Sequence, residues 1–261
     1  MAGRAMSVQA CAEIVARGDP DRFLAAMSCP PSARAALFPL YALNVEIARA
    51  PYVTQEPAIA EMRLQWWRDA LDEIAAGAPA RAHEVAGPLT DLLRRTGVEV
   101  ALLDAAVAAR RWDIWHAPFE TDADFARHLD RTAGNLAWAS ARALGAPPAD
   151  EAAVRDGAWA AGLVRWFQAV PEMEARGMKP LPDGRPEAVR ALAHQGLDRL
   201  ASARRAVRRG PAALALRPAW EAGALLRQVA DAPGRVADGA VHLSEFRRRL
   251  LLSAAAVRGG W

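Results

Sequence analysis

The sequence is poor in cysteine, lysine and tyrosine, and it lacks a long apolar run. The only cysteines, Cys11 and Cys29, are far apart and form no CxxC pattern, which argues against a disulfide framework or a cysteine-based metal site. No stretch without a charged residue is longer than the one from Ala35 to Val45, which contains Pro39. Because a membrane-spanning helix needs about 20 apolar residues, the sequence predicts no transmembrane segment.

The N-terminal residues also lack the apolar stretch of a secretory signal peptide. Arg4, Glu13 and Arg17 interrupt every candidate for such a stretch, and a signal peptide needs an unbroken apolar region of about 7 to 15 residues. We therefore expect a cytoplasmic protein, and this expectation includes a location at the inner face of the membrane.

Arginine supplies almost all of the positive charge, since Lys179 is the only lysine among 33 basic residues. The formal net charge is +3 and the isoelectric point is about 9.4. Guanidinium groups form forked pairs with carboxylate or phosphate, so the arginine bias permits anion binding. A GC-rich genome with an alanine- and arginine-heavy proteome explains the bias equally well. The small positive excess does not indicate nucleic-acid binding.

Apolar residues at three- and four-residue spacing dominate the chain and predict an all-α fold. Ser7, Asp19 and Thr121 are expected to cap three of the helices. Neither a linker nor a fixed-period repeat divides the sequence, so residues 1–261 are expected to form a single domain. The expected helices cover residues 7–17, 20–29, 32–50, 57–76, 84–96, 99–115, 122–144, 148–174, 186–209, 211–231 and 242–257.

Two charged stretches each allow two interpretations. On a helix, Asp69, Asp72 and Glu73 share one face, where they form either a Mg²⁺ site or a solvated surface with an Arg68–Asp72 pair. The basic run 247–249 precedes three leucines, and this helix either lies on an anionic membrane or partner surface or packs in the core. No HExxH, GxSxG, P-loop or GxGxxG motif is present, so zinc hydrolysis, nucleophilic triads and dinucleotide binding have no support.

Three segments, in the right order, resemble the squalene/phytoene synthase family. They are Arg63–Ile74, Phe119–Gly145 and Gly177–Pro182, which ends in Leu-Pro. The resemblance implies an isoprenoid-synthase-like helical bundle around a central cavity. It also implies a head-to-head prenyl diphosphate transfer, in which carboxylates of two aspartate-rich motifs hold Mg²⁺ against the departing diphosphate.

The chain departs from the family at both aspartate-rich motifs. Arg49 stands where the first motif has an aspartate, and Glu172 is the one acid in register in the second. The resemblance therefore implies no metal and no cofactor, with Mg²⁺ required only if the chain is an enzyme. The residues of the first segment are Asn44, Glu46, Ala48, Arg49 and Tyr52. Those of the second are Arg165, Ala169, Glu172 and Met173.

Within the family, Ala42–Ala48 and Met62–Trp67 look most similar to a divergent branch that assists assembly of respiratory complex I. This resemblance implies a non-catalytic protein whose partner is a subunit of a membrane-bound respiratory complex, with a peripheral membrane contact and no nucleic acid.

Two alternatives stay open. One is a prenyltransferase, in which Glu46, Glu172 and Asp69 or Asp72 converge on one cavity. The other is a carrier for an isoprenoid or other lipid, which needs an open apolar tunnel. The residues expected to line the cavity are Tyr41, Trp66, Trp138, Trp166 and Phe167.

Overall fold

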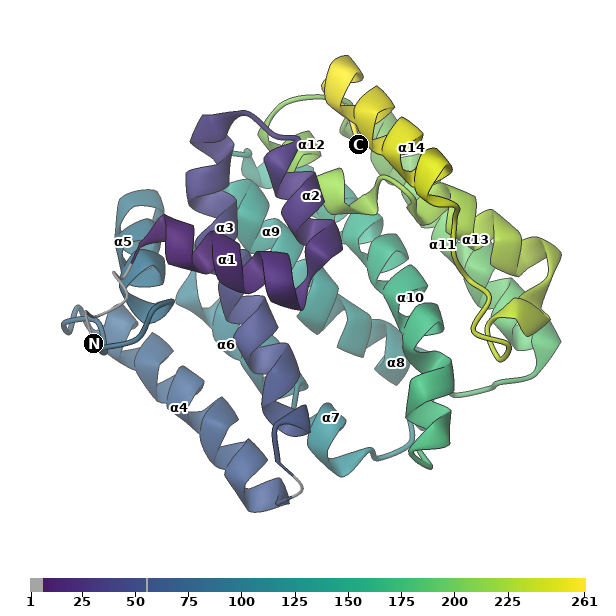
Figure 1. Cartoon of the computed structure of the whole chain (residues 1–261), viewed down its shortest axis with the longest axis horizontal. Helices are drawn as coiled ribbons and strands as arrows, with labels where there is room; N and C mark the ends of the chain where they lie inside the picture. The colour runs from purple at the N-terminus through teal and green to yellow at the C-terminus, as the bar shows by residue number, and fades with distance from the viewer. Residues whose placement is uncertain (1–6, 55) are drawn as a thin grey trace.

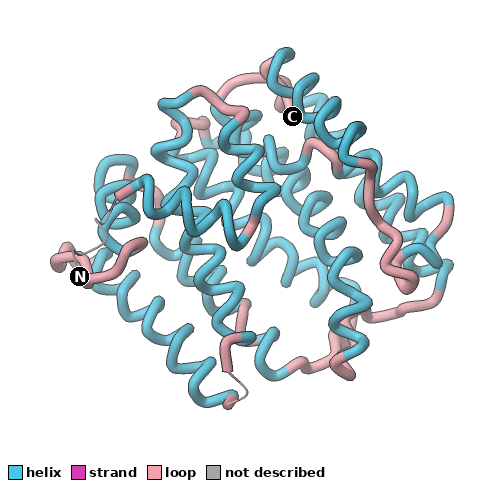
Figure 2. The backbone as a smooth tube through the Cα atoms, in the orientation of Figure 1, coloured by secondary structure: helices cyan, strands magenta, loops and turns pink. Residues whose placement is uncertain are grey.

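The computed structural model describes residues 7–54 and 56–261, and over these residues it contains helices and no strand (Figure 2). The predicted all-α fold is therefore confirmed. Arg4, which interrupts the apolar N-terminal stretch, lies outside the described residues. No helix in the described part of the chain is long and apolar enough to cross a membrane.

The α-helices form a layered bundle in which the first and last helices lie on the outside (Figure 1). They are α1 (Val8–Gly18), α2 (Pro20–Met27), α3 (Pro31–Arg49), α4 (Pro57–Ala75), α5 (Ala86–Thr96), α6 (Val100–Ala109), α7 (Trp112–Trp115), α8 (Asp122–Leu129), α9 (Asn135–Ala143), α10 (Glu151–Ala175), α11 (Pro186–Ala206), α12 (Pro211–Ala215), α13 (Ala222–Asp231) and α14 (Glu245–Arg258). Short one-turn elements join several of them, including η1 (Ala50–Tyr52) after α3 and η4 (Arg217–Ala219) before α13.

Local capping chemistry sets several helix starts as the sequence predicts. The Ser7 hydroxyl accepts a hydrogen bond from the Ala10 amide at 3.2 Å, and the Asp19 carboxylate accepts one from the Arg22 amide at 3.0 Å. Thr121 caps α8 in the same way. Each cap satisfies a backbone donor that has no partner inside its helix.

Three predicted elements differ from the observed ones. The helix expected over 99–115 is two helices, α6 and α7, which end at the left-handed His116 (φ 53°). The helix expected over 211–231 is divided into α12, η4 and α13, where Pro218 removes an amide donor. The helix expected over 122–144 is continuous but contains a π-turn at Asp130–Gly134.

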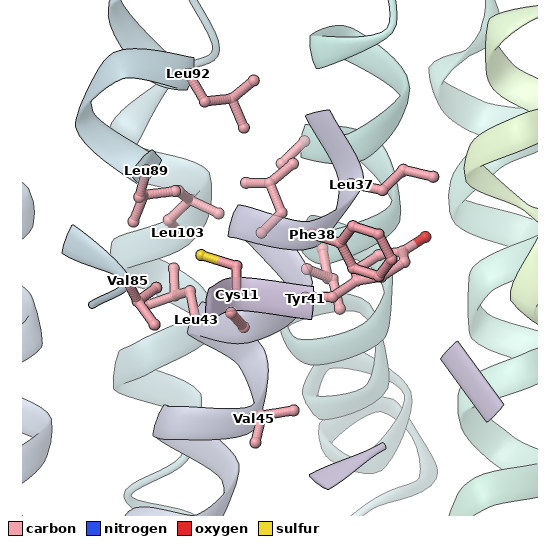
Figure 3. Close-up of a cluster of buried hydrophobic side chains, with 14 of the residues drawn as sticks. Cys11, Leu37, Phe38, Tyr41, Leu43, Val45, Val85, Leu89, Leu92 and Leu103 are labelled. Atoms are coloured by element: carbon pink, nitrogen blue, oxygen red, sulfur yellow. The ribbon is translucent and has the colours of Figure 1, made fainter. Parts of the chain in front are cut away.

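The two largest apolar clusters hold most of the bundle together. In the first, α3 is central and contacts α1 and α5, and Figure 3 shows Leu43 of α3 on the side of Cys11 and Val85, with Phe38 and Tyr41 on the other side of the helix. In the second, α10 packs on α11, and α11 packs on α13. The two clusters fix α3 and α10, which carry the two segments that correspond to the aspartate-rich motifs.

Candidate functional site

A groove of about 640 Å³ opens beside the ends of α1 and α3, the start of α2 and the end of α6. We call it the arginine groove. The residues that line it are Ile14, Arg17, Gly18, Asp19, Arg22, Asn44, Val45, Ala48, Arg49, Tyr52 and Arg110.

The C-terminal part of α3, with η1 directly after it, brings most of the first predicted segment to the arginine groove. Asn44, Ala48 and Tyr52 follow one another at four-residue intervals and all line it, together with Arg49. Such steps return to one side of a helix. Glu46 is not among the lining residues, and its carboxylate lies 3.6 Å from the Arg49 guanidinium.

Four guanidinium groups and one carboxylate line the arginine groove. Arg22 is paired with the carboxylate, Asp19. Burial alone would raise the pKa of Asp19, but Arg22, through its charge and its amide, holds that pKa below its usual value. Arg17 forms no ion pair within residues 7–54 and 56–261. With Arg49 and Arg110 added, the groove carries a positive excess that suits an anion.

Arg110 is only partly neutralised. One of its terminal nitrogens lies 3.3 Å from the Asp113 carboxylate and another lies 3.5 Å from the Asn44 side-chain oxygen. Its buried Nε has no hydrogen-bond partner among the described residues. Burial raises the pKa of Asp113, although Arg110 opposes this shift.

The second predicted segment, on α10, places its one in-register acid in solvent. The Glu172 side chain is 72% exposed and pairs with Arg176 one turn later. Arg176 in turn lies over the Tyr52 ring, 4.9 Å from its centroid. Met173 is buried and Ala169 is half-buried. Tyr52 of the first segment is therefore in contact with Arg176, one turn after Glu172 of the second segment.

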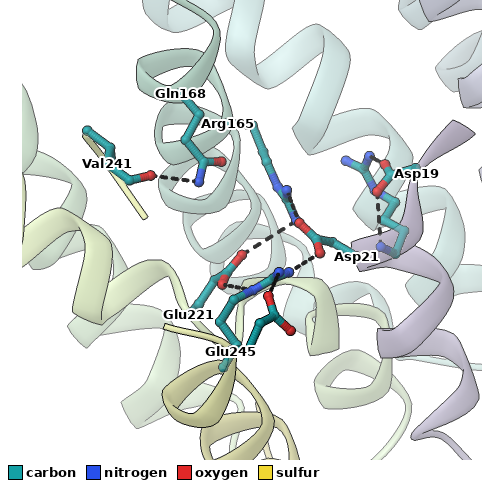
Figure 4. A network of polar contacts seen from close by, with 9 residues as sticks. Asp19, Asp21, Arg165, Gln168, Glu221, Val241 and Glu245 are labelled. Atoms are coloured by element: carbon teal, nitrogen blue, oxygen red, sulfur yellow. Dashed lines mark hydrogen bonds and ion pairs between the residues drawn. The ribbon is translucent and has the colours of Figure 1, made fainter. Parts of the chain in front are cut away.

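Arg165, the first residue of the second segment, points into a network of charges (Figure 4). Asp21 of α2 pairs with Arg165 of α10 and with Arg248 of α14. Glu221, just before α13, lies 3.8 Å from Arg165 and 3.2 Å from Arg248. Glu245 accepts a hydrogen bond from Arg248 at 2.9 Å. This network ties four helices together across the bundle.

Sequence reasoning missed Asp21 and Glu221, and it identified Arg248 only as part of the basic run 247–249. Asp21 and Glu221 belong to no motif and lie far apart along the chain, so no local signal identifies them. Glu221 is only 4% exposed. Its burial raises its pKa, although Arg165 and Arg248 oppose the shift.

The acids of α4 are held by neighbours away from the arginine groove. The Asp69 carboxylate accepts a hydrogen bond from Gln65 at 2.7 Å, and Glu73 accepts two from Arg81 at 2.8 Å. The predicted Arg68–Asp72 pair is wrong, because Arg68 instead binds Asp104 of α6. Asp104 is 36 residues away in the sequence, so local spacing rules could not predict this pair.

The donor set does not fit a Mg²⁺ cluster. None of the four candidate acids lines the arginine groove; these acids are Glu46, Glu172, Asp69 and Asp72. In the part of the chain that the structure describes, no group of three or more His, Cys, Asp or Glu side chains is placed to hold a metal ion. A bridging Mg²⁺ site needs several oxygen ligands in one place, whereas these acids are separate.

Between the central helices the apolar space is small. A cavity of about 30 Å³ lies between α3, α9 and α10, and Tyr41, Leu136 and Gly162 are among its lining residues. Sites for small organic ligands are commonly about 300–1,000 Å³. As it stands, the cavity has room for about one water molecule.

Tyr41 is the one predicted cavity aromatic among the residues that line this cavity. Trp66 lies edge-on to Trp67, with ring centroids 4.9 Å apart, and under Arg81. Trp166 lies in a buried aromatic cluster and donates a hydrogen bond to the Pro180 carbonyl at 2.8 Å. The remaining two, Trp138 and Phe167, are buried in apolar clusters.

Residues 15–185 match the family model described as squalene/phytoene synthase. The chain belongs to this family. The resemblance that the three segments indicated is thereby confirmed, and so is the isoprenoid-synthase-like fold.

Curated relatives lie in the branch that the sequence indicated. The chain is 26% identical over 174 residues to NADH dehydrogenase (ubiquinone) complex I, assembly factor 6, of Bos taurus, covering 66% of this chain and 52% of that protein. The Homo sapiens protein gives the same identity and coverage. The Drosophila melanogaster homolog is 30% identical over 131 residues, which cover 48% of this chain and 39% of the homolog. The chain thus spans about half the length of the curated relatives it matches.

Solved structures share the fold over nearly the whole chain. A dehydrosqualene synthase in complex with ligand superposes with a TM-score of 0.81 at 16% identity, covering 96% of this chain and 95% of that chain. A squalene synthase from Alicyclobacillus acidocaldarius gives a TM-score of 0.62 at 13% identity, with 97% and 94% covered. At these identities the likeness concerns the fold alone.

Proposed function

We propose that this chain is a non-catalytic member of the squalene/phytoene synthase family that serves as an assembly factor for a membrane-bound respiratory complex of the complex I type. Its partner would be a subunit of that complex, and its place of action the inner face of the membrane. The proposal has two parts, the absence of prenyl transfer and the role in assembly, and each has its own test.

The charge of the arginine groove carries the first part. Arg17, Arg22, Arg49 and Arg110 line the place to which the first aspartate-rich motif corresponds, and Asp19 is already paired. Two like unit charges 4 Å apart repel by about 4 kcal/mol at an effective dielectric constant near 20. Pairing with Asp19, Glu46 and Asp113 reduces this repulsion for Arg22, Arg49 and Arg110. A dication would therefore meet chiefly the charge of Arg17, and it would find no unpaired carboxylate among the residues that line the groove. The usual electrostatic help for diphosphate departure would then be missing.

The matched relatives support the second part. Their names describe assembly factors of complex I, and the matched stretch covers 66% of this chain. A protein that retains the family's bundle without its metal sites can still present a surface to a partner. The carrier alternative finds less support, because the interior cavity is only about 30 Å³. The enzyme alternative finds less support, because its four candidate acids do not line one groove.

Prenyl transfer is tested directly with the purified chain, Mg²⁺ and farnesyl or geranylgeranyl diphosphate. We expect no pyrophosphate release above that of a protein-free reaction, because the groove offers no set of bridging carboxylates. An active dehydrosqualene synthase assayed in parallel shows that the substrates are competent. Metal-dependent pyrophosphate release with a condensed hydrocarbon product would defeat the first part of the proposal.

The assembly role is tested by deleting the gene in its source organism and measuring intact complex I on native gels with an NADH-dehydrogenase activity stain. We expect a several-fold loss of assembled complex, restored by the wild-type gene. A double variant, Glu46→Gln with Glu172→Gln, is expected to restore assembly fully, since neither acid lines the arginine groove. If that variant is expressed at the wild-type level but does not restore complex I, the result would favour the prenyltransferase alternative. An unchanged amount of complex I after deletion would contradict the assembly role.

A further inference from the structure

The last helix, α14, lies on the outside of the bundle with few buried contacts (Figure 1). Only Ala255 is buried among its 14 residues. Its inner side rests on Ala25 of α2 and on Trp220, with Leu251 and Leu252 partly buried beside them. Arg248 also points inward, into the charge network of Asp21 and Glu221. Packing in the core, which was one of two interpretations of the basic run 247–249, therefore holds for only one side of the helix.

The outer side of α14 presents an apolar stripe. Phe246 is 77% exposed, Leu250 is 56% exposed and Val257 is 87% exposed. The steps of four and seven residues between them return to one side of a helix. No described part of the chain covers this stripe.

Arginines flank the stripe on both sides. At 100° per residue, Arg247 and Arg258 lie on one side of the stripe and Arg249 on the other, and all three are exposed. No acidic residue occurs from 246 to 258, and the preceding Glu245 is already bound by Arg248. The outer face of α14 is therefore apolar along its middle and positive along both edges.

Positive charge continues next to the C-terminal end of α14. The Trp261 indole donates a hydrogen bond to the Val207 carbonyl at 2.8 Å, which brings the exposed Arg208 and Arg209 close to the end of the chain. The basic character thus extends beyond a single helix.

We propose that the outer face of α14 docks this protein on an anionic lipid bilayer. Phe246, Leu250 and Val257 would enter the boundary between headgroups and acyl chains, and Arg247, Arg249 and Arg258 would bind lipid phosphates. A helix of 14 residues is about 21 Å long, which suits a position in the plane of the membrane. The positive edges on both sides of an apolar stripe favour a lipid surface over a protein groove.

Vesicle sedimentation tests this docking with the intact chain. We expect it to bind vesicles of phosphatidylcholine with one-third phosphatidylglycerol, and to bind pure phosphatidylcholine vesicles at least tenfold more weakly. Raising the salt concentration should release it, because salt screens the arginine–phosphate attraction. Absence of binding to anionic vesicles, or equal binding to both kinds, would overturn the inference. The assay contains no respiratory-chain protein, so its outcome is independent of the assembly role.

Variants locate the surface. Phe246→Ser with Leu250→Ser should weaken binding by roughly tenfold or more, since the apolar contact with the bilayer is lost. Arg247→Gln with Arg249→Gln should weaken it by about fivefold for each arginine removed. All four side chains are exposed, so the circular-dichroism spectrum should not change.

The matched control is Ile59→Ser with Met62→Ser, which removes two exposed apolar side chains from α4, 41% and 62% exposed. This variant should bind as the wild type does. A loss of binding in this control, or wild-type binding in both α14 variants, would place the membrane contact elsewhere and overturn the inference.

Discussion

Lowering the pH from 7 to 5 should reduce the free energy of unfolding by about 2 kcal/mol through one buried histidine, His128. Its pKa is lowered from 6.5 to about 3, first by burial and then by the charge of Arg110. In the unfolded chain, His128 therefore binds a proton as the pH falls through 6.5, whereas in the folded chain it stays neutral until the pH is near 3. The contribution of His128 to the free energy of unfolding is fully present above pH 6.5 and is lost progressively as the pH falls towards 3.

The surroundings of His128 explain why the folded protein excludes the proton. Its ring lies between aromatic rings, 5.6 Å from Trp112, 5.5 Å from Phe119 and 5.0 Å from Trp166 by ring centroids. Its Nε2 atom is buried without a hydrogen-bond partner among the described residues. An imidazolium ion here would lose its hydration and gain no anion in return.

Urea unfolding at pH 7, 6 and 5 measures this effect. His128→Phe keeps an aromatic ring in the cluster and removes the titration, so this variant should lose about 2 kcal/mol less than the wild type over the interval. His194→Gln is the matched control, because His194 is exposed on α11, and it should show the wild-type pH dependence. An equal acid sensitivity of wild type and His128→Phe would show that other groups cause it.

Much of the fold follows from local chemistry that the sequence displays. The caps at Ser7, Asp19 and Thr121 form as predicted, because a cap involves residues only three positions apart. The break between α6 and α7 does not follow from local patterns. There the Trp112 indole donates a hydrogen bond to the Ala117 carbonyl at 2.6 Å, and its ring stacks on Phe119 at 4.9 Å. These contacts form only once the chain turns, so periodicity alone predicted one helix.

The candidate site also has one part that local sequence patterns predict and another that depends on packing. Asn44, Ala48, Arg49 and Tyr52 could be predicted to lie together, because a single helix and its last turn carry them. Their partners in the groove come from α1, α2 and the end of α6, and nothing in the sequence around those arginines marks them. Arg165 was predicted from the family resemblance, but its direction depends on Asp21 and Glu221, which only the packing of α2 and α13 brings near.

The charge network of Figure 4 should make Arg248 far more important to stability than its neighbours on α14. Arg248→Met leaves Asp21 and the buried Glu221 to share Arg165. Removal of one partner from a fully buried pair costs about 3–5 kcal/mol. Arg248 retains 24% exposure, so solvent screening reduces the expected loss to roughly 2 kcal/mol at pH 7. Urea unfolding followed by circular dichroism measures it.

Two further variants separate the loss of charge pairing from the loss of a long side chain. Arg249→Met removes an exposed arginine that forms no ion pair with any residue the structure describes, and its unfolding free energy should stay within about 0.5 kcal/mol of the wild type. In a Glu221→Gln background, Arg248→Met should cost about half as much as it does in the wild type, because Glu221, the most buried of the three carboxylates that Arg248 pairs with, has lost its charge. Equal costs in the two backgrounds would mean that Arg248 does not stabilise the protein through Glu221.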